Sequence, residues 1–82
     1  LHAQDEARFR LEFLGDAAGA LAIASQNWTE QREAADARIL LEAALAAKAP
    51  QAARPVLDWL SSSGFEDARL ARLAADLKAL SR

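Results

Sequence analysis

The feature that most constrains this fold is a short motif that occurs three times at a nearly constant interval. Each copy consists of an acidic residue, alanine, arginine and a large apolar residue, and the copies begin at Glu6, Asp36 and Asp67, which are 30 and 31 residues apart. The second and third copies also follow a tryptophan, Trp28 or Trp59, with seven residues between. A fixed interval of about 20 to 50 residues is typical of proteins built from stacked supersecondary units. We therefore expect a repeat array.

The units of this array are expected to be helical. Alanine and leucine, which have the highest helix propensities, make up much of the 52% of residues that are hydrophobic. Residues that favour strands are scarce, since the chain has a single valine, a single threonine and no tyrosine. The sequence therefore predicts one all-α domain that spans residues 1–82.

Hydrophobic periodicity and turn residues predict about five helices. The clearest is the third, where Ala37, Leu40, Leu41, Ala44 and Leu45 recur at the spacing of a buried stripe. We expect helices near residues 3–14, 17–29, 34–48, 50 to the glycine at position 64, and 66–80. The first four would form two antiparallel hairpins, near residues 3–32 and 33–65, stacked as a short right-handed solenoid.

The ends of these helices carry recognisable signals. Gly15 is suited to the left-handed conformation that ends a helix, and Asp16 is a favoured N-cap. Gly15 and Gly19 form a GxxxG spacing, which we expect to allow a close approach of the first two helices. Pro50 suits a first helical turn, whereas Pro55 should kink the fourth helix or delay its regular part.

The fifth helix, near residues 66–81, is expected to cap the array. When the repeats are aligned on their shared motif, Arg72 and Asp76 occupy the positions of Leu41 and Leu45. The face that would receive a further hairpin has therefore become charged, as a solenoid requires at its end. We expect the chain to be the C-terminal part of a longer protein, with further sequence upstream of Leu1.

The helix pairs resemble tetratricopeptide repeats. The resemblance rests on the alanine-rich second helix, on Gly15-Asp16 followed by Ala20-Leu21, and on Leu41 at a position where that family favours leucine. The interval of 30–31 residues is shorter than that family's repeat of about 34. The resemblance implies a curved array that binds a protein or peptide along the face built from the first helix of each pair.

This face defines the candidate partner-binding residues. They are Glu6, Phe9, Phe13, Asp36, Ile39, Ala43 and Leu70. Trp28 and Trp59 lie at the same place in two successive units, and we interpret them as packing anchors between repeats.

Composition argues against several other functions. A net charge of −2 does not favour nucleic-acid binding, which depends on a strong basic excess or patch. The longest apolar run, residues 17–24, is far too short to span a membrane, and no signal peptide is recognisable. His2 is the only histidine and the chain has no cysteine, so we expect no metal site. The serines at positions 61–63 lack a neighbouring base that would activate a nucleophile.

We expect a non-catalytic scaffold that uses a helical-repeat surface to bind a protein or peptide. Two alternatives remain open. The chain is a structural cap or homodimerisation segment, in which Phe9 and Phe13 meet a second copy, or it is a regulatory appendage of an upstream enzyme. No cofactor, nucleic-acid partner or membrane insertion is expected.

Overall fold

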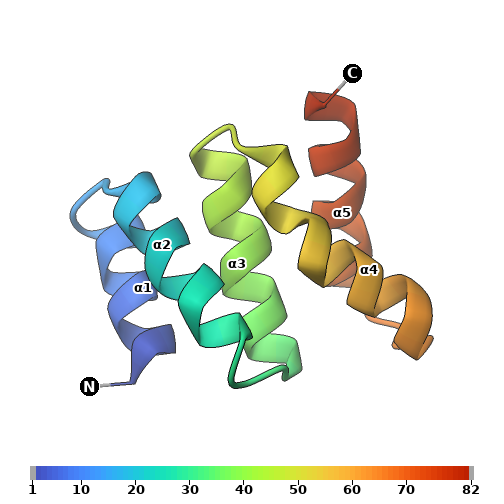
Figure 1. Cartoon of the computed structure of the whole chain (residues 1–82). Helices are drawn as coiled ribbons and strands as arrows, with labels where there is room; N and C mark the ends of the chain where they lie inside the picture. Colours follow the sequence, from blue (N-terminus) through green and yellow to red (C-terminus); the bar gives the residue numbers. More distant parts are fainter. Residues whose placement is uncertain (1, 82) are drawn as a thin grey trace.

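The computed structural model describes residues 2–81, which contain five α-helices and no strand (Figure 1). The elements are α1 (Ala3–Glu12), α2 (Ala17–Trp28), α3 (Ala34–Ala46), a 3₁₀ turn η1 (Pro50–Ala53), α4 (Arg54–Ser63) and α5 (Ala68–Leu80). The predicted all-α class and the number of helices are therefore confirmed. The expected domain ends at residues 1 and 82 lie outside the described residues.

The helices differ in how closely they pack against their neighbours (Figure 1). α2 lies between α1 and α3 and packs against both, and α3 also packs against α5 and, over a smaller area, against α1. α4 is different, because it makes only a small contact with α3 and its backbone lies largely apart from α5. The turn η1, which precedes α4, contacts both α3 and α5.

The core consists largely of small side chains. Ala7, Ala20, Ala24, Ala37 and Ala44 are all buried where α1, α2 and α3 meet. Because alanine adds little volume, it lets helix axes approach closely. The larger buried residues are Ile39, Leu40, Leu41, Val56, Leu70 and Leu77. The predicted stripe on the third helix is thereby confirmed, with four of its members buried and Leu45 partly buried against them.

Asp36 joins three helices through hydrogen bonds. Its side chain is 1% exposed, and its Oδ1 accepts from Gln4 Nε2 of α1 at 2.9 Å and from Asn27 Nδ2 of α2 at 2.7 Å. Its Oδ2 accepts from the backbone N–H of Glu33 at 3.1 Å, in the first turn of α3. A buried carboxylate needs such partners, because an unpaired buried charge is strongly unfavourable.

The connection between α1 and α2 is fixed by Asp16. Gly15 has a φ of 64°, as predicted, and the Asp16 carboxylate accepts a hydrogen bond from the backbone N–H of Gly19 at 2.9 Å. This hydrogen bond, together with Arg10 at 3.1 Å, lowers the pKa of Asp16. A Cβ at Gly19 would lie 2.0 Å from the Asp16 carboxylate. The predicted role of Gly19 in helix contact was therefore wrong, because this glycine makes room for the cap.

The second half of the chain follows its proline and glycine signals. Pro50 begins η1, and regular α-helix starts only at Arg54 with Pro55 in its first turn, so the predicted delay is confirmed. Gly64 ends α4 in the left-handed conformation, with a φ of 70°. Phe65 then folds back onto Trp59, at 5.5 Å between ring centroids.

Two equivalent ion pairs lie on α1 and α3, and their charges also link the two helices. Arg8 lies 3.9 Å from Glu12 and Arg38 lies 2.9 Å from Glu42. Arg8 of α1 also donates a hydrogen bond to Glu42 of α3. Burial tends to raise the pKa of Glu42, but its hydrogen bonds from Arg38 and Arg8 outweigh burial and leave this pKa below its ordinary value.

Candidate functional site

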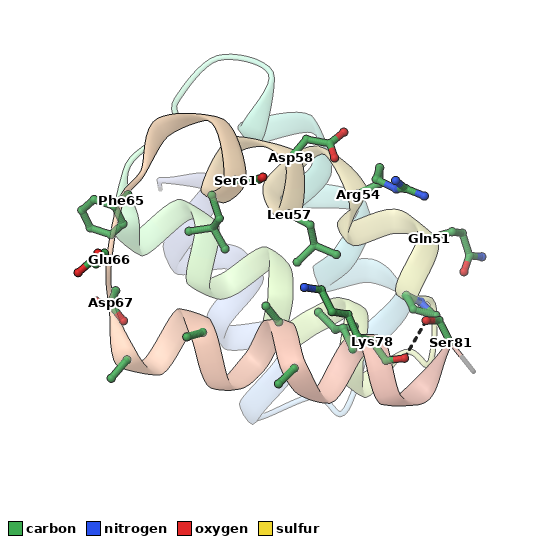
Figure 2. Close-up of a pocket in the computed structure, with 17 residues that line it drawn as sticks. Gln51, Arg54, Leu57, Asp58, Ser61, Phe65, Glu66, Asp67, Lys78 and Ser81 are labelled. Carbon is green, nitrogen blue, oxygen red and sulfur yellow. Dashed lines mark hydrogen bonds between the residues drawn. The ribbon is translucent and has the colours of Figure 1, made fainter.

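An open apolar groove lies between α4 and α5, with a volume of about 1170 Å³ (Figure 2). Leu57 and Leu60 of α4 line one wall, and Leu77 of α5 lines the other. Beside Leu77, α5 also presents Ala71 and Ala75 to the groove. Apolar lining with a few polar groups at the rim is typical of sites that bind other molecules.

The groove exists because α4 is anchored by the buried Val56 and by the contact of Trp59 with Trp28 of α2, while only the segments at its two ends join it to α5. At one end η1 contacts α3 and α5, and at the other the residues 64–67 connect α4 directly to α5. Val56 is the buried residue of α4, while Leu57 and Leu60 remain only partly covered. Between these two ends, α4 therefore leaves the facing side of α5 uncovered.

Alanines on the facing side of α5 are exposed, unlike those packed where α1, α2 and α3 meet. Ala71 and Ala75 are exposed to solvent, whereas the alanines between α1, α2 and α3 are buried. The two sets have the same chemistry and differ only in whether another helix covers them. The side of α5 that faces the groove is thus suited to pack against a helix, but none covers it among residues 2–81.

The two ends of the groove carry opposite charges (Figure 2). Glu66 and Asp67 lie at the end where α4 connects to α5, and Arg54 and Lys78 lie at the end next to η1. Asp58 lies on the α4 rim between these ends, and Figure 2 shows its carboxylate directed away from α5. The charges therefore distinguish one direction along the groove from the other.

A smaller hollow of about 410 Å³ brings together the arginines of all three motif copies. Arg8, Arg38 and Arg69 line it from α1, α3 and α5, together with Asp5 and Asp67. The hollow therefore mixes basic and acidic groups, and two of its three arginines are already engaged in ion pairs with Glu42.

The predicted partner-binding face is wrong as a continuous surface. Asp36, Ile39 and Ala43 are buried in α3, which packs against α1, α2 and α5, and Leu70 is buried in α5, which packs against α3. Glu6 is half-buried and pairs with Arg10 at 3.3 Å. Of the predicted face, the phenylalanines remain exposed.

These phenylalanines form a separate apolar patch on the outer side of α1. Phe9 and Phe13 are 51% and 75% exposed and stack with 5.5 Å between ring centroids. Leu14, 58% exposed, follows them in the chain. This patch belongs to α1, whereas the groove belongs to α4 and α5.

The structure brings the two repeated tryptophans into contact with each other. Trp28 of α2 is 3% exposed and meets Trp59 of α4 edge to face, at 5.3 Å between ring centroids. Trp59 is only partly buried and also contacts Phe65. The two residues occupy equivalent places in the sequence, but they form one aromatic cluster in which their burial differs.

Sequence reasoning did not single out the groove residues. Beside its leucines at positions 70, 73, 77 and 80, the fifth helix carries a second line of small residues at helical spacing, Ala68, Ala71 and Ala75. This line was the available signal for a second packing surface. Its exposure depends on where α4 lies, which local sequence does not specify.

The described residues carry no other recognisable site. Among residues 2–81, no group of three or more His, Asp or Glu side chains is placed to hold a metal ion. No helix in this range has the length and apolar character needed to cross a membrane. Comparisons with protein-family models, with curated proteins and with solved structures found no match to this chain, so the resemblance to tetratricopeptide repeats stays a prediction.

Proposed function

We propose that this chain is a non-catalytic interaction module of the helical-repeat type, which binds a segment of a partner protein in the groove between α4 and α5. The observation that carries the proposal is the apolar lining of the groove, in which the partly covered Leu57 and Leu60 of α4 face the exposed Ala71 and Ala75 of α5. An exposed apolar concavity with a charged rim is a common sign of a binding surface.

The proposal includes the solenoid architecture. α1 with α2, and α3 with α4, are the two antiparallel hairpins, and α5 is the cap. The repeated motif supports this assignment, because its three copies lie in the first helix of each unit and in the cap. The charged outer face of α5 also supports it, since Arg72 and Asp76 are exposed and lie 4.0 Å apart.

A peptide-display selection against the folded chain tests the proposal. We expect enriched peptides that bind saturably and lose at least about tenfold in affinity when Ala75→Glu places a charge in the groove. Ala79→Glu is the matched control, because Ala79 is also exposed on α5 but does not line the groove. If no peptide is enriched, or if the two variants bind equally well, the groove is not a binding site.

A second candidate function is homodimerisation through the phenylalanine patch, favoured by the exposure of Phe9, Phe13 and Leu14. Sedimentation equilibrium tests it. We expect the unaltered chain to self-associate and the Phe13→Glu variant to remain monomeric. Because Phe13 is already exposed, this substitution should leave the melting temperature almost unchanged. A mass that stays at the 8.8 kDa of the monomer at every concentration would exclude this candidate.

A further inference from the structure

The packing of α2 provides an internal reference for what the groove lacks. α2 lies against both α1 and α3, with Ala20 and Ala24 buried in these contacts. α4 is the second helix of the following unit, yet it leaves α5 largely uncovered. The uncovered side of α5 is therefore a surface of the kind that elsewhere in this chain packs against a helix.

The size and lining of the groove suit an added helix. α5 has 13 residues, which corresponds to a length of about 20 Å. Ala71 and Ala75 are four residues apart on α5, so they form a ridge low enough for another helix axis to approach within about 8–10 Å. Leu57 and Leu60 on the opposite wall offer apolar contacts to the same occupant.

The charges at the ends of the groove select the polarity of the occupant. The acidic end, with Glu66 and Asp67, is complementary to basic side chains. The end with Arg54 and Lys78 is complementary to acidic ones. Helices favour acidic residues in their first turn and basic residues in their last turn, because these complement the helix dipole. Such a helix matches both ends of the groove when it runs antiparallel to α5.

We infer that the occupant is an amphipathic α-helix of about three to four turns, aliphatic on one side, with its acidic N-terminus beside Lys78 and its basic C-terminus beside Glu66. This inference rests on the proposed function, since it names the partner of the same groove. Binding of an amphipathic helix in an apolar groove is a recurrent mode of peptide recognition. The complementary charges at the two ends of this groove favour it here over an uncharged extended segment.

A synthetic peptide of about 14 residues tests the inference. It carries leucines at the i, i+3, i+4 and i+7 spacing, glutamates in its first turn and lysines in its last turn. A control peptide has the same composition, with the leucines redistributed around the helix. We expect saturable binding of the first peptide, at least about tenfold weaker binding of the second, and a gain of helical circular dichroism on binding.

The charge order is tested by exchanging the two ends of the groove. The double variant Glu66→Lys with Lys78→Glu should weaken binding of the peptide by about fivefold at low salt, and by less at high salt. The charge-exchanged peptide should bind this variant better than it binds the unaltered chain. Both residues are exposed, so circular dichroism should show that the variant remains folded.

The direction of the bound helix has its own readout. Phe65 lines the groove, and both tryptophans lie in the aromatic cluster behind it. A nitroxide label at the C-terminus of the peptide should therefore quench tryptophan fluorescence more strongly than the same label at its N-terminus. Equal quenching by the two labels, or stronger quenching by the N-terminal label, would contradict the antiparallel arrangement.

The outcomes separate this inference from the proposed function. If peptides selected by display bind without becoming helical, yet remain sensitive to Ala75→Glu, the groove binds a partner and the helix inference is wrong. The inference also fails if the control peptide binds as tightly as the amphipathic one. If neither synthetic nor selected peptides bind, both the inference and the proposed function fall.

Discussion

Replacing Asp36 with alanine should destabilise the chain far more than any other change at an acidic position of the repeated motif. The Asp36 carboxylate accepts hydrogen bonds from Gln4, from Asn27 and from the backbone N–H of Glu33. A hydrogen bond to a charged group contributes a net stabilisation of about 1.5–3 kcal/mol. Gln4 and Asn27 are only half-buried, so water can replace part of what they lose. We therefore expect a loss of about 3–4 kcal/mol for the three bonds together.

This loss is large for a small chain. At about 0.05–0.15 kcal/mol per residue, 82 residues correspond to roughly 4–12 kcal/mol of total stability. The expected decrease in melting temperature is about 12–32 °C, since each kcal/mol corresponds to about 4–8 °C at this size. Urea denaturation followed by circular dichroism measures the free energy directly, and the slope with urea should stay unchanged if the native fold is retained.

The repeat itself provides the control. Asp67 occupies the same motif position, but it is exposed and caps α5 by accepting from the backbone N–H of Leu70 at 3.0 Å. Asp67→Ala should cost only about 1 kcal/mol, the usual effect of losing an N-cap. Asn27→Ala combined with Asp36→Ala should cost less than the sum of the two single changes, because they remove the same bond. If Asp36→Ala and Asp67→Ala cost the same, Asp36 does not hold the three helices together.

Three further predictions follow from the described contacts. Trp28→Ala should cost about 3–5 kcal/mol in urea denaturation but Trp59→Ala only about 1–2, because Trp59 is partly exposed; equal losses would contradict this difference. Glu42 stabilises the fold fully above its ordinary pKa of 4.5, and this contribution is lost as the pH falls through its lowered folded-state pKa. Glu42→Gln should therefore flatten the acid side of the pH dependence of the urea midpoint, and an unchanged profile would argue against this role. Arg72→Leu with Asp76→Leu should cause self-association in sedimentation experiments, because it exposes an apolar outer face on α5; a variant that stays monomeric would show that this face does not cap the array.

The helices themselves could be predicted because their signals are local. The buried stripe of α3, the cap at Asp16 and the left-handed glycines at 15 and 64 each depend on a few neighbouring residues. Pro55 delays the start of α4 because its ring fixes φ and removes a backbone N–H, which are properties of the residue itself. Such features follow from sequence whatever the rest of the chain does.

The surfaces could not be predicted, because equivalent motif positions meet different surroundings. Phe9, Ile39 and Leu70 share one motif position, yet Phe9 is exposed while the other two are buried. α3 and α5 pack together, whereas no helix within residues 2–81 covers the outer side of α1. Asp36 and Asp67 also share a position, but α3 begins two residues before Asp36 and α5 begins one residue after Asp67. Which helix covers a residue is a tertiary property that the repeat does not encode.

The way α4 is held has a consequence for how the chain moves. Val56 is the buried residue of α4, Trp59 is only partly buried against Trp28, and the helix makes only a small contact with α3. Elements with few buried contacts open at a lower free energy than the rest of a protein. The amide protons of α4 should therefore exchange with solvent faster than those of α2, which is covered on two sides. A partner seated between α4 and α5 should slow that exchange, because it would add buried contacts to α4.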